Sequence, residues 1–110
     1  MNIRPIPATL LLTILLSGCG TPVPADKADY VGTWRSQEMR LSITQEGNIN
    51  YERHRGSART SIDGPLQEFH GNDFSVGFWF ISTTFVVSKP PYQEGGEWKM
   101  VVDGVELTKD

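Results

Sequence analysis

Apolar and polar residues alternate with a period of two along most of the chain after Tyr30. This is the period of a β-strand with one face in a core and the other in water. No long stretch has the 3.6-residue period of an amphipathic helix. The apolar positions of the alternating runs are Met39, Leu41, Ile43, Ile49, Tyr51, Phe74, Val76, Phe78, Phe80, Phe85, Val87, Trp98, Met100, Val102, Val105 and Leu107.

Turn-forming residues separate these runs, at 46–48, 63–65, 70–73, 90–91, 94–96 and 103–104. Asp63-Gly64 and Asp103-Gly104 are typical of type I′ hairpin turns, whose two central residues both need a positive φ. Short strands with tight turns predict an all-β domain, an antiparallel meander of about seven or eight strands. Closure into a barrel and folding as a sandwich both fit this pattern.

The first residues follow a different pattern, with Arg4 ahead of an apolar run over 6–16. A helix over this run would span about 16 Å, roughly half of the hydrocarbon core of a bilayer. The length therefore favours the hydrophobic region of a cleaved signal peptide over a membrane-spanning helix.

Leu16-Ser17-Gly18-Cys19 follows the run and resembles the lipobox of bacterial lipoprotein precursors at all four positions. The resemblance implies lipid on the Cys19 thiol, cleavage between Gly18 and Cys19, and acylation of the new amino group. The alternative is an ordinary secretory signal with an incidental cysteine. We therefore predict a signal peptide over 1–18, a lipidated N-terminus and tether over 19–29, and an all-β domain over 30–110.

Cys19 is the only cysteine, so the chain cannot form an internal disulfide. In enterobacterial lipoproteins an aspartate after the lipidated cysteine favours the inner membrane, and Gly20 stands here instead. By that resemblance we expect an outer-membrane anchor facing the periplasm. Pro22 and Pro24 predict an extended tether over 21–29 that spans roughly 28 Å.

The part after the tether is about 80 residues long, which is enough for one domain with its own core. The formal net charge of the whole chain is −3. An acidic balance argues against a general nucleic-acid binder, so no nucleic-acid partner is expected.

Gly32-Thr33-Trp34 looks like the Gly-x-Trp that opens lipocalin-type barrels. In that family the tryptophan plugs the closed end and a basic residue of the last strand packs over its ring. The resemblance implies this role for Lys99 or Lys109, through a cation–π contact. The alternative is that Trp34 is an ordinary core residue.

Few residues point to catalysis, and no cofactor or metal site is expected. His54 and His70 are the only histidines, and neither has ligand spacing to a second histidine or a cysteine. A His70–Asp73 pair is the one metal or acid/base arrangement that the spacing leaves open. No nucleophile elbow or phosphate-binding loop occurs, so we predict that the protein is not an enzyme.

Arg53, Arg55 and Arg59 form the one basic cluster of the sequence. Arg53 and Arg55 share a strand face, and Arg59 is expected across a hairpin from them. This cluster would suit lipid phosphate, a glycan or an acidic partner. The alternative is a solvated edge strand whose charges prevent aggregation.

Phe78, Trp79, Phe80 and Ile81 place large apolar groups on both faces of one strand. Three explanations compete, and we rank them in this order. Gly77 marks a bulge that reverses the parity of the strand, or a loop around Pro90-Pro91-Tyr92 covers the second face. The third is an exposed apolar patch that binds something.

These features together predict a lipid-anchored, non-enzymatic domain that binds a partner protein or an envelope component such as a glycan. The predicted binding residues are Arg53, Arg55, Arg59, Phe78, Trp79 and Phe80. One alternative is a small lipocalin-like carrier, which needs a cavity that its core residues do not fill. Another is an inhibitor of an envelope hydrolase or protease, which needs a protruding loop such as 88–96. The residues expected to fill the interior are Trp34, Phe74, Phe85, Trp98 and Met100.

Overall fold

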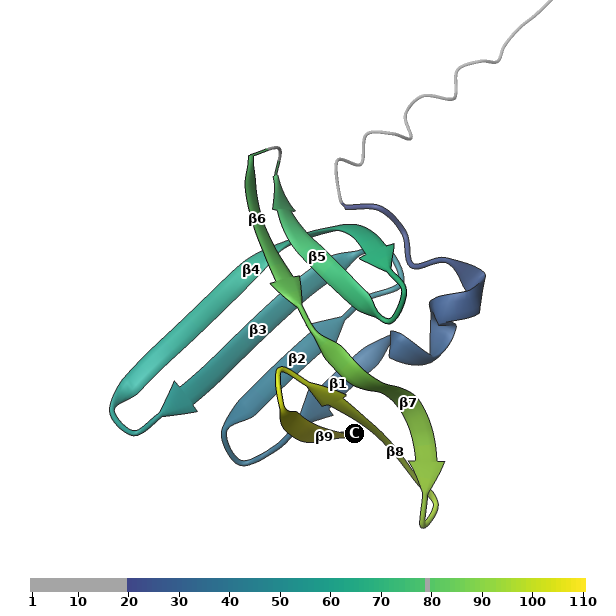
Figure 1. Cartoon of the computed structure of the whole chain (residues 1–110), viewed down its shortest axis with the longest axis vertical. Helices are drawn as coiled ribbons and strands as arrows, with labels where there is room; N and C mark the ends of the chain where they lie inside the picture. Colours follow the sequence, from purple (N-terminus) through teal and green to yellow (C-terminus); the bar gives the residue numbers. More distant parts are fainter. Residues whose placement is uncertain (1–19, 79) are drawn as a thin grey trace, which may run out of the picture.

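Nine strands and one short 3₁₀ helix make up the computed structural model, which describes residues 20–78 and 80–110 (Figure 1). Cys19 and Trp79, two residues with predicted roles, therefore lie outside the described residues. The elements are η2 (Ala25–Tyr30), β1 (Gly32–Arg35), β2 (Met39–Ile43), β3 (Asn48–Arg55), β4 (Ala58–His70), β5 (Asp73–Phe78), β6 (Ile81–Phe85), β7 (Val87–Glu94), β8 (Glu97–Val102) and β9 (Val105–Lys109).

The strands form one antiparallel sheet in the order β6-β5-β4-β3-β2-β1-β9-β8-β7. Successive strands pair as neighbours, except β6 and β7, which form the two edges of the sheet. The first and last strands, β1 and β9, also pair with each other. The sheet curls into a half-barrel, with β5 to β7 crossing in front of β1 to β4 in Figure 1. The predicted all-β meander is confirmed, and it has more strands than the seven or eight expected.

Alternation along the strands places one apolar face inside the curl. Met39, Leu41 and Ile43 of β2 are buried, whereas Arg40 and Ser42 between them are partly exposed. The inward residues of the other strands complete a single core. Its most deeply buried large side chains are Trp34, Phe74, Phe85, Leu41, Ile49, Leu66, Met100 and Leu107.

Of the residues expected to fill the interior, four are at most 1 % exposed, and the fifth, Trp98, packs half-buried against them. Phe74 and Phe85 stack with ring centroids 5.2 Å apart, and Tyr51 lies 4.9 Å from Phe85. Aromatic rings therefore occupy the middle of the half-barrel.

Trp34 is the largest fully buried side chain of this core. Its indole Nε1 donates to the backbone oxygen of Tyr30 at 2.9 Å, so its one polar group is satisfied. Lys109 on β9 lies over the ring, with Nζ 5.0 Å from the Trp34 centroid and 5.3 Å from that of Trp98. Of the two lysines predicted for this role, Lys109 makes the contact, whereas Lys99 lies within 3.3 Å of the Thr108 hydroxyl.

Asp103-Gly104 forms the predicted tight turn between β8 and β9. The φ angles of 49° and 80° at these residues are the positive values that a type I′ turn requires. The turn also fixes the connection between β6 and β7, because Asp103 Oδ1 accepts a hydrogen bond from the N–H of Val86 at 2.9 Å. Asp73 Oδ1 accepts from the next amide, that of Val87, at 2.8 Å.

The second predicted Asp-Gly turn is wrong. Asp63 and Gly64 lie inside β4, where they pair with Asn50 and Ile49 of β3. Pro65 is tolerated in this strand because β4 begins to pair with β5 only at the following residue, Leu66. The Leu66 amide donates to Gly47 on the β3 side, so the nitrogen of Pro65 faces the side without a partner strand.

The predicted loop over 88–96 is also wrong, because most of it is the edge strand β7. Two irregularities in the pairing with β8, around Lys89, accommodate Pro90 and Pro91. An edge strand tolerates prolines because half of its amides have no partner strand. Only the turn at Gly95 and Gly96 follows the prediction.

The segment predicted as a free tether is instead docked on the domain over the residues that the structure describes. The Thr21 amide donates to the Leu66 oxygen at 3.0 Å, and the Val23 amide donates to the Gln45 oxygen at 2.9 Å. Val23 is 3 % exposed, and η2 then leads into the buried Tyr30. Burial of Val23 and these hydrogen bonds explain why the segment does not extend into solvent.

Candidate binding surfaces

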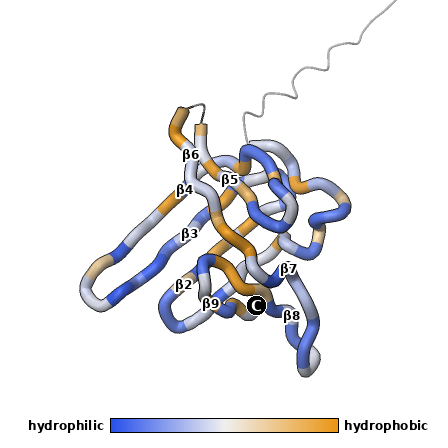
Figure 2. The backbone as a smooth tube through the Cα atoms, in the orientation of Figure 1, coloured by the Kyte–Doolittle hydropathy of each residue, from blue (hydrophilic) through white to orange (hydrophobic). Residues whose placement is uncertain are grey.

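The β5–β6 hairpin projects beyond the core and exposes its apolar tip. Phe78 is 64 % exposed, Phe80 86 % and Ile81 66 %. Figure 2 shows hydrophobic residues on both arms of this tip, which stands free of the rest of the domain. The third explanation for the aromatic stretch, an exposed apolar patch, therefore describes these residues, and we call them the apolar tip.

The bulge predicted at Gly77 is not there, since Gly77 pairs in register with Ser82 and Phe78 with Ile81. The irregularity lies one strand away, at Gln67 of β4. Gly77 has another reason to be glycine: its φ is 143°, and a Cβ there would lie 2.1 Å from the Ile81 oxygen.

The predicted cover by Pro90-Pro91-Tyr92 is also wrong. Pro90 and Pro91 instead line a hollow of about 160 Å³ with Asp26, Tyr30 and Asn72. The Tyr30 hydroxyl donates to the Asn72 oxygen at 2.8 Å. Burial, and to a smaller extent the Asp73 carboxylate, raise the pKa of Tyr30 to about 12.

The three arginines predicted as one cluster lie on two faces of the sheet. Arg59 pairs with His54 across the β3–β4 hairpin, so it lies on the face opposite Arg53 and Arg55. Its guanidinium forms an ion pair with Glu52. The hairpin register, which the sequence does not specify, is the reason for the difference.

Arg53 is held by a carboxylate as well. Its Nη2 lies 3.0 Å from Glu38 Oε2, and its side chain is 13 % exposed. Burial lowers the pKa of Arg53, but hydrogen bonds to Glu38 and Tyr51 outweigh this effect and raise it. Arg53 and Arg59 therefore act first as partners of carboxylates on the domain itself. Arg55 is exposed at the end of β3.

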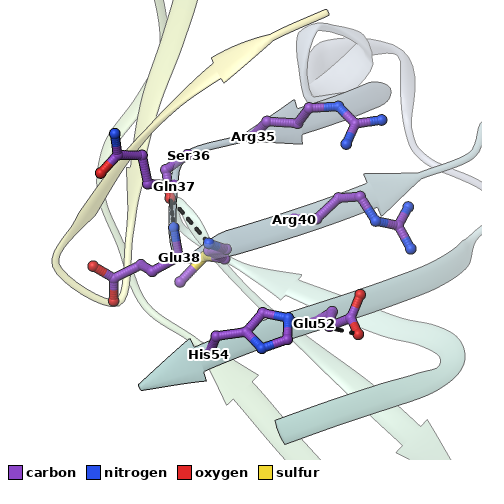
Figure 3. Close-up of a pocket in the computed structure, with 8 residues that line it drawn as sticks. Arg35, Ser36, Gln37, Glu38, Arg40, Glu52 and His54 are labelled. Atoms are coloured by element: carbon purple, nitrogen blue, oxygen red, sulfur yellow. Dashed lines mark hydrogen bonds and ion pairs between the residues drawn. The ribbon is translucent and has the colours of Figure 1, made fainter. Parts of the chain in front are cut away.

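A second surface, which the sequence interpretation missed, is the outer face of β1 to β4. Arg35 pairs with Arg40 in the β1–β2 register, and Arg40 pairs with Glu52 of β3. These residues and His54 line a hollow of about 240 Å³, in which the two arginine side chains lie side by side (Figure 3). We call this surface the polar face.

Hydrogen-bonding groups continue along the polar face beyond this hollow. Arg40 Nη2 donates to Asn50 Oδ1 at 2.7 Å. A second hollow of about 230 Å³ extends from Arg40 over Asn50 and Ser61 to Asp63. The sequence shows that the polar residues of each alternating run share one face of their strand. It does not show that these faces of β1 to β4 lie side by side, because that depends on the register of the four strands.

A metal or acid/base site requires histidine or carboxylate side chains that lie close together. No group of three or more histidine, aspartate or glutamate side chains within 20–78 and 80–110 has metal-binding geometry. His70 pairs with Asp73 in the sheet register, but the Asp73 carboxylate accepts the Val87 amide. His70 Nε2 lies 3.4 Å from Glu68 at the surface.

No model of a protein family matches this chain, and searches of curated proteins and of solved structures find no match. Among the residues that the structure describes, no helix has the length and hydrophobicity needed to cross a bilayer.

Proposed function

We propose that this protein is a lipid-anchored domain of the bacterial envelope that binds an envelope component at its surface and catalyses no reaction. The anchor is lipid on Cys19, inferred from Leu16-Ser17-Gly18-Cys19. By the same resemblance the anchor lies in the outer membrane and the domain faces the periplasm.

The observation that carries surface binding is the filled interior. Trp34, Phe74 and Phe85 are at most 1 % exposed and occupy the space where a carrier would hold its ligand. Recognition by this domain therefore takes place on its outside. This supports the surface-binding proposal over the lipocalin-like carrier.

The polar face is the surface that we propose for recognition. Arg35 Nε donates to Asp110 Oδ2 at 2.8 Å, and Glu52 is paired with Arg59. The remaining guanidinium N–H groups of Arg35 and Arg40 lie on this face together with the acceptors of Asn50 and Asp63. Mixed donors and acceptors in shallow hollows suit a polar ligand, such as a glycan or a polar protein surface. The inhibitor alternative loses its main support, because the 88–96 segment is mostly strand and not a protruding loop.

Two measurements test this proposal. Intact mass spectrometry of the protein from native membranes should give a chain that begins at Cys19 and carries lipid. An unmodified chain, or one that retains residues 1–18, would rule out the lipoprotein. Fractionation of a Cys19→Ala variant should show loss of the lipid-dependent membrane association.

The polar face is tested by a photo-reactive amino acid placed at Ser61, which is exposed on β4, and at Gln93, exposed on β7. A discrete cross-linked envelope species is expected from position 61 and not from the control position 93. Equal labelling from both positions, or none from position 61, would contradict the assignment of this face.

A further inference from the structure

The start of the described chain and the β5–β6 hairpin are attached to the same residue of β4. Thr21 Oγ1 donates to the Gln67 backbone oxygen at 3.1 Å, and the Gln67 side chain accepts from the Ser82 hydroxyl at 2.7 Å. Ser82 directly follows Ile81 of the apolar tip. Figure 1 shows the beginning of the docked segment and the hairpin at the same end of the molecule.

Gly20 fixes the place at which the chain reaches the domain. A Cβ at this position would lie 2.5 Å from the Leu66 nitrogen and 2.6 Å from the Gly47 oxygen. Such close backbone packing leaves no free linker between Gly20 and the domain. Cys19 directly precedes Gly20 in the sequence, so a lipid on its sulfur would be attached one residue away from this surface.

We propose that the apolar tip, formed by Phe78, Phe80 and Ile81, inserts into the lipid interface beside the acylated Cys19. The bilayer is its occupant, and the domain thus has two points of attachment to one membrane. This inference rests on the lipid anchor proposed above. It replaces the roughly 28 Å tether expected from the sequence with a domain that lies directly on the lipid.

The chemistry of the hairpin suits a membrane interface. Residues 74–88 contain no aspartate, glutamate, lysine, arginine or histidine, so shallow insertion buries no charge. Transfer of aromatic and branched aliphatic side chains from water to the boundary between headgroups and acyl chains lowers their free energy. Phe78 and Ile81 form the last strand pair of the hairpin, so insertion to a shallow depth of about 5–10 Å would be enough to take in the apolar tip.

The location of the tip favours lipid over a protein partner. Binding of a soluble partner does not require an apolar patch to lie close to the residue that carries the lipid, whereas insertion into the same bilayer does. Here the first described residues lie against β4, the strand that pairs with β5 of the hairpin. A bilayer that holds the acyl chains of Cys19 therefore comes within reach of the tip without any rearrangement of the domain.

The test uses the full-length precursor, processed in cells, purified from membranes and returned to vesicles of phosphatidylethanolamine and phosphatidylglycerol. Single cysteines replace Phe80 at the tip, Thr83 further down β6, and Gln93 on β7. All three sites are exposed, so labelling should not disturb the core. A nitroxide label reports its surroundings through its accessibility to oxygen, which partitions into lipid, and to a water-soluble nickel chelate.

We expect the label at position 80 to be oxygen-accessible and shielded from the chelate, by several-fold relative to position 93. Position 83 should give an intermediate value. Chelate access at 80 equal to that at 93, with Cys19 lipidated in the same sample, would overturn the insertion and leave the lipoprotein intact. Shielding of position 80 from both reagents would mean that a second protein copy covers the tip, and would also overturn it.

The mass of each sample separates the two proposals. A preparation in which Cys19 carries no lipid removes the anchor and this inference together. A lipidated preparation with a water-exposed tip removes the inference alone. Because the Cys19 sulfur is blocked by its thioether in the lipidated protein, the introduced cysteine is the only thiol that takes the label.

Discussion

Lys109 Nζ lies 5.0 Å from the ring centroid of Trp34, although the two residues are far apart in the sequence, on the last and the first strand. They also face each other in the β1–β9 register. One lysine thus covers the buried tryptophan of the first strand and contacts Trp98 on β8 as well. This contact therefore joins side chains of β1, β8 and β9, three neighbouring strands of the sheet.

Replacement of Lys109 by methionine should destabilise the domain by about 1–2 kcal/mol, because it removes the cation and keeps the apolar stem over the rings. Lys109→Arg should recover most of this loss. The measurement is the free energy of unfolding in urea. Lys89→Met is the matched control, since Lys89 is exposed and lies over the ring of Tyr92, which is not part of the core. An equal loss there would show that the Trp34 contact contributes no more than a surface contact.

Gly104→Val should destabilise the β8–β9 hairpin by about 1–2 kcal/mol, because a β-branched residue resists a φ of 80°. Beyond the neighbouring residues in the chain, no atom lies within 4 Å of the added Cβ, so the backbone conformation is the main source of this cost. Gly64→Ala, in the other Asp-Gly pair, should change the melting temperature little. Comparable losses at the two positions would contradict the assignment of Gly64 to a continuous strand.

Gly20→Ala should release the docked N-terminal segment, because its methyl group would overlap the backbone of Leu66 and Gly47. Hydrogen exchange then reads out the result: the Thr21 and Val23 amides should lose protection, while the β2 and β3 amides keep theirs. Thr21→Val, which removes only the bond from the hydroxyl to Gln67, is the milder control. Unchanged protection in Gly20→Ala would show that the segment tolerates a side chain there.

Tyr30 should make the stability fall at alkaline pH. Its native pKa of about 12 exceeds the ordinary value of 10, so the folded chain holds the proton more tightly than the unfolded chain. The stabilisation is complete below pH 10 and is lost as the pH rises through 12, by about 2–3 kcal/mol. The difference in unfolding free energy between wild type and Tyr30→Phe should shrink over this range; parallel curves would exclude the effect.

The strand content of the fold was predictable because burial follows alternation. Met39, Leu41 and Ile43 read as an inward face in the sequence and are one in the structure. Lys109 could be placed over Trp34 only as one of two candidates, since the choice depends on which lysine of the last hairpin faces inward. Asp103-Gly104 could be assigned as a turn because an alternating apolar run ends before it and another begins after it. These two runs pair with each other in the structure.

Pairing between distant strands accounts for what the sequence did not reveal. Asp63-Gly64 has the same letters as the true turn, but eight consecutive pairs with β3 carry it straight through β4. Period-two alternation places Phe78 on the same face of its strand as Phe74 and Val76. It cannot show that the strand extends past the core and leaves Phe78 exposed. The split of Arg53 and Arg59 onto two faces depends on the register of their hairpin, which no local pattern reveals.

The two edges of the sheet differ in their capacity to accept another strand. Pro90 and Pro91 remove two donors from β7, and the irregular pairing there further disrupts the line of amides. The opposite edge, β6, has neither proline nor charge over Ile81–Phe85. A stack of copies needs both edges of every copy, so edge-to-edge growth would end at a pair joined through β6. The prolines of β7 thus oppose open-ended polymerisation of this domain.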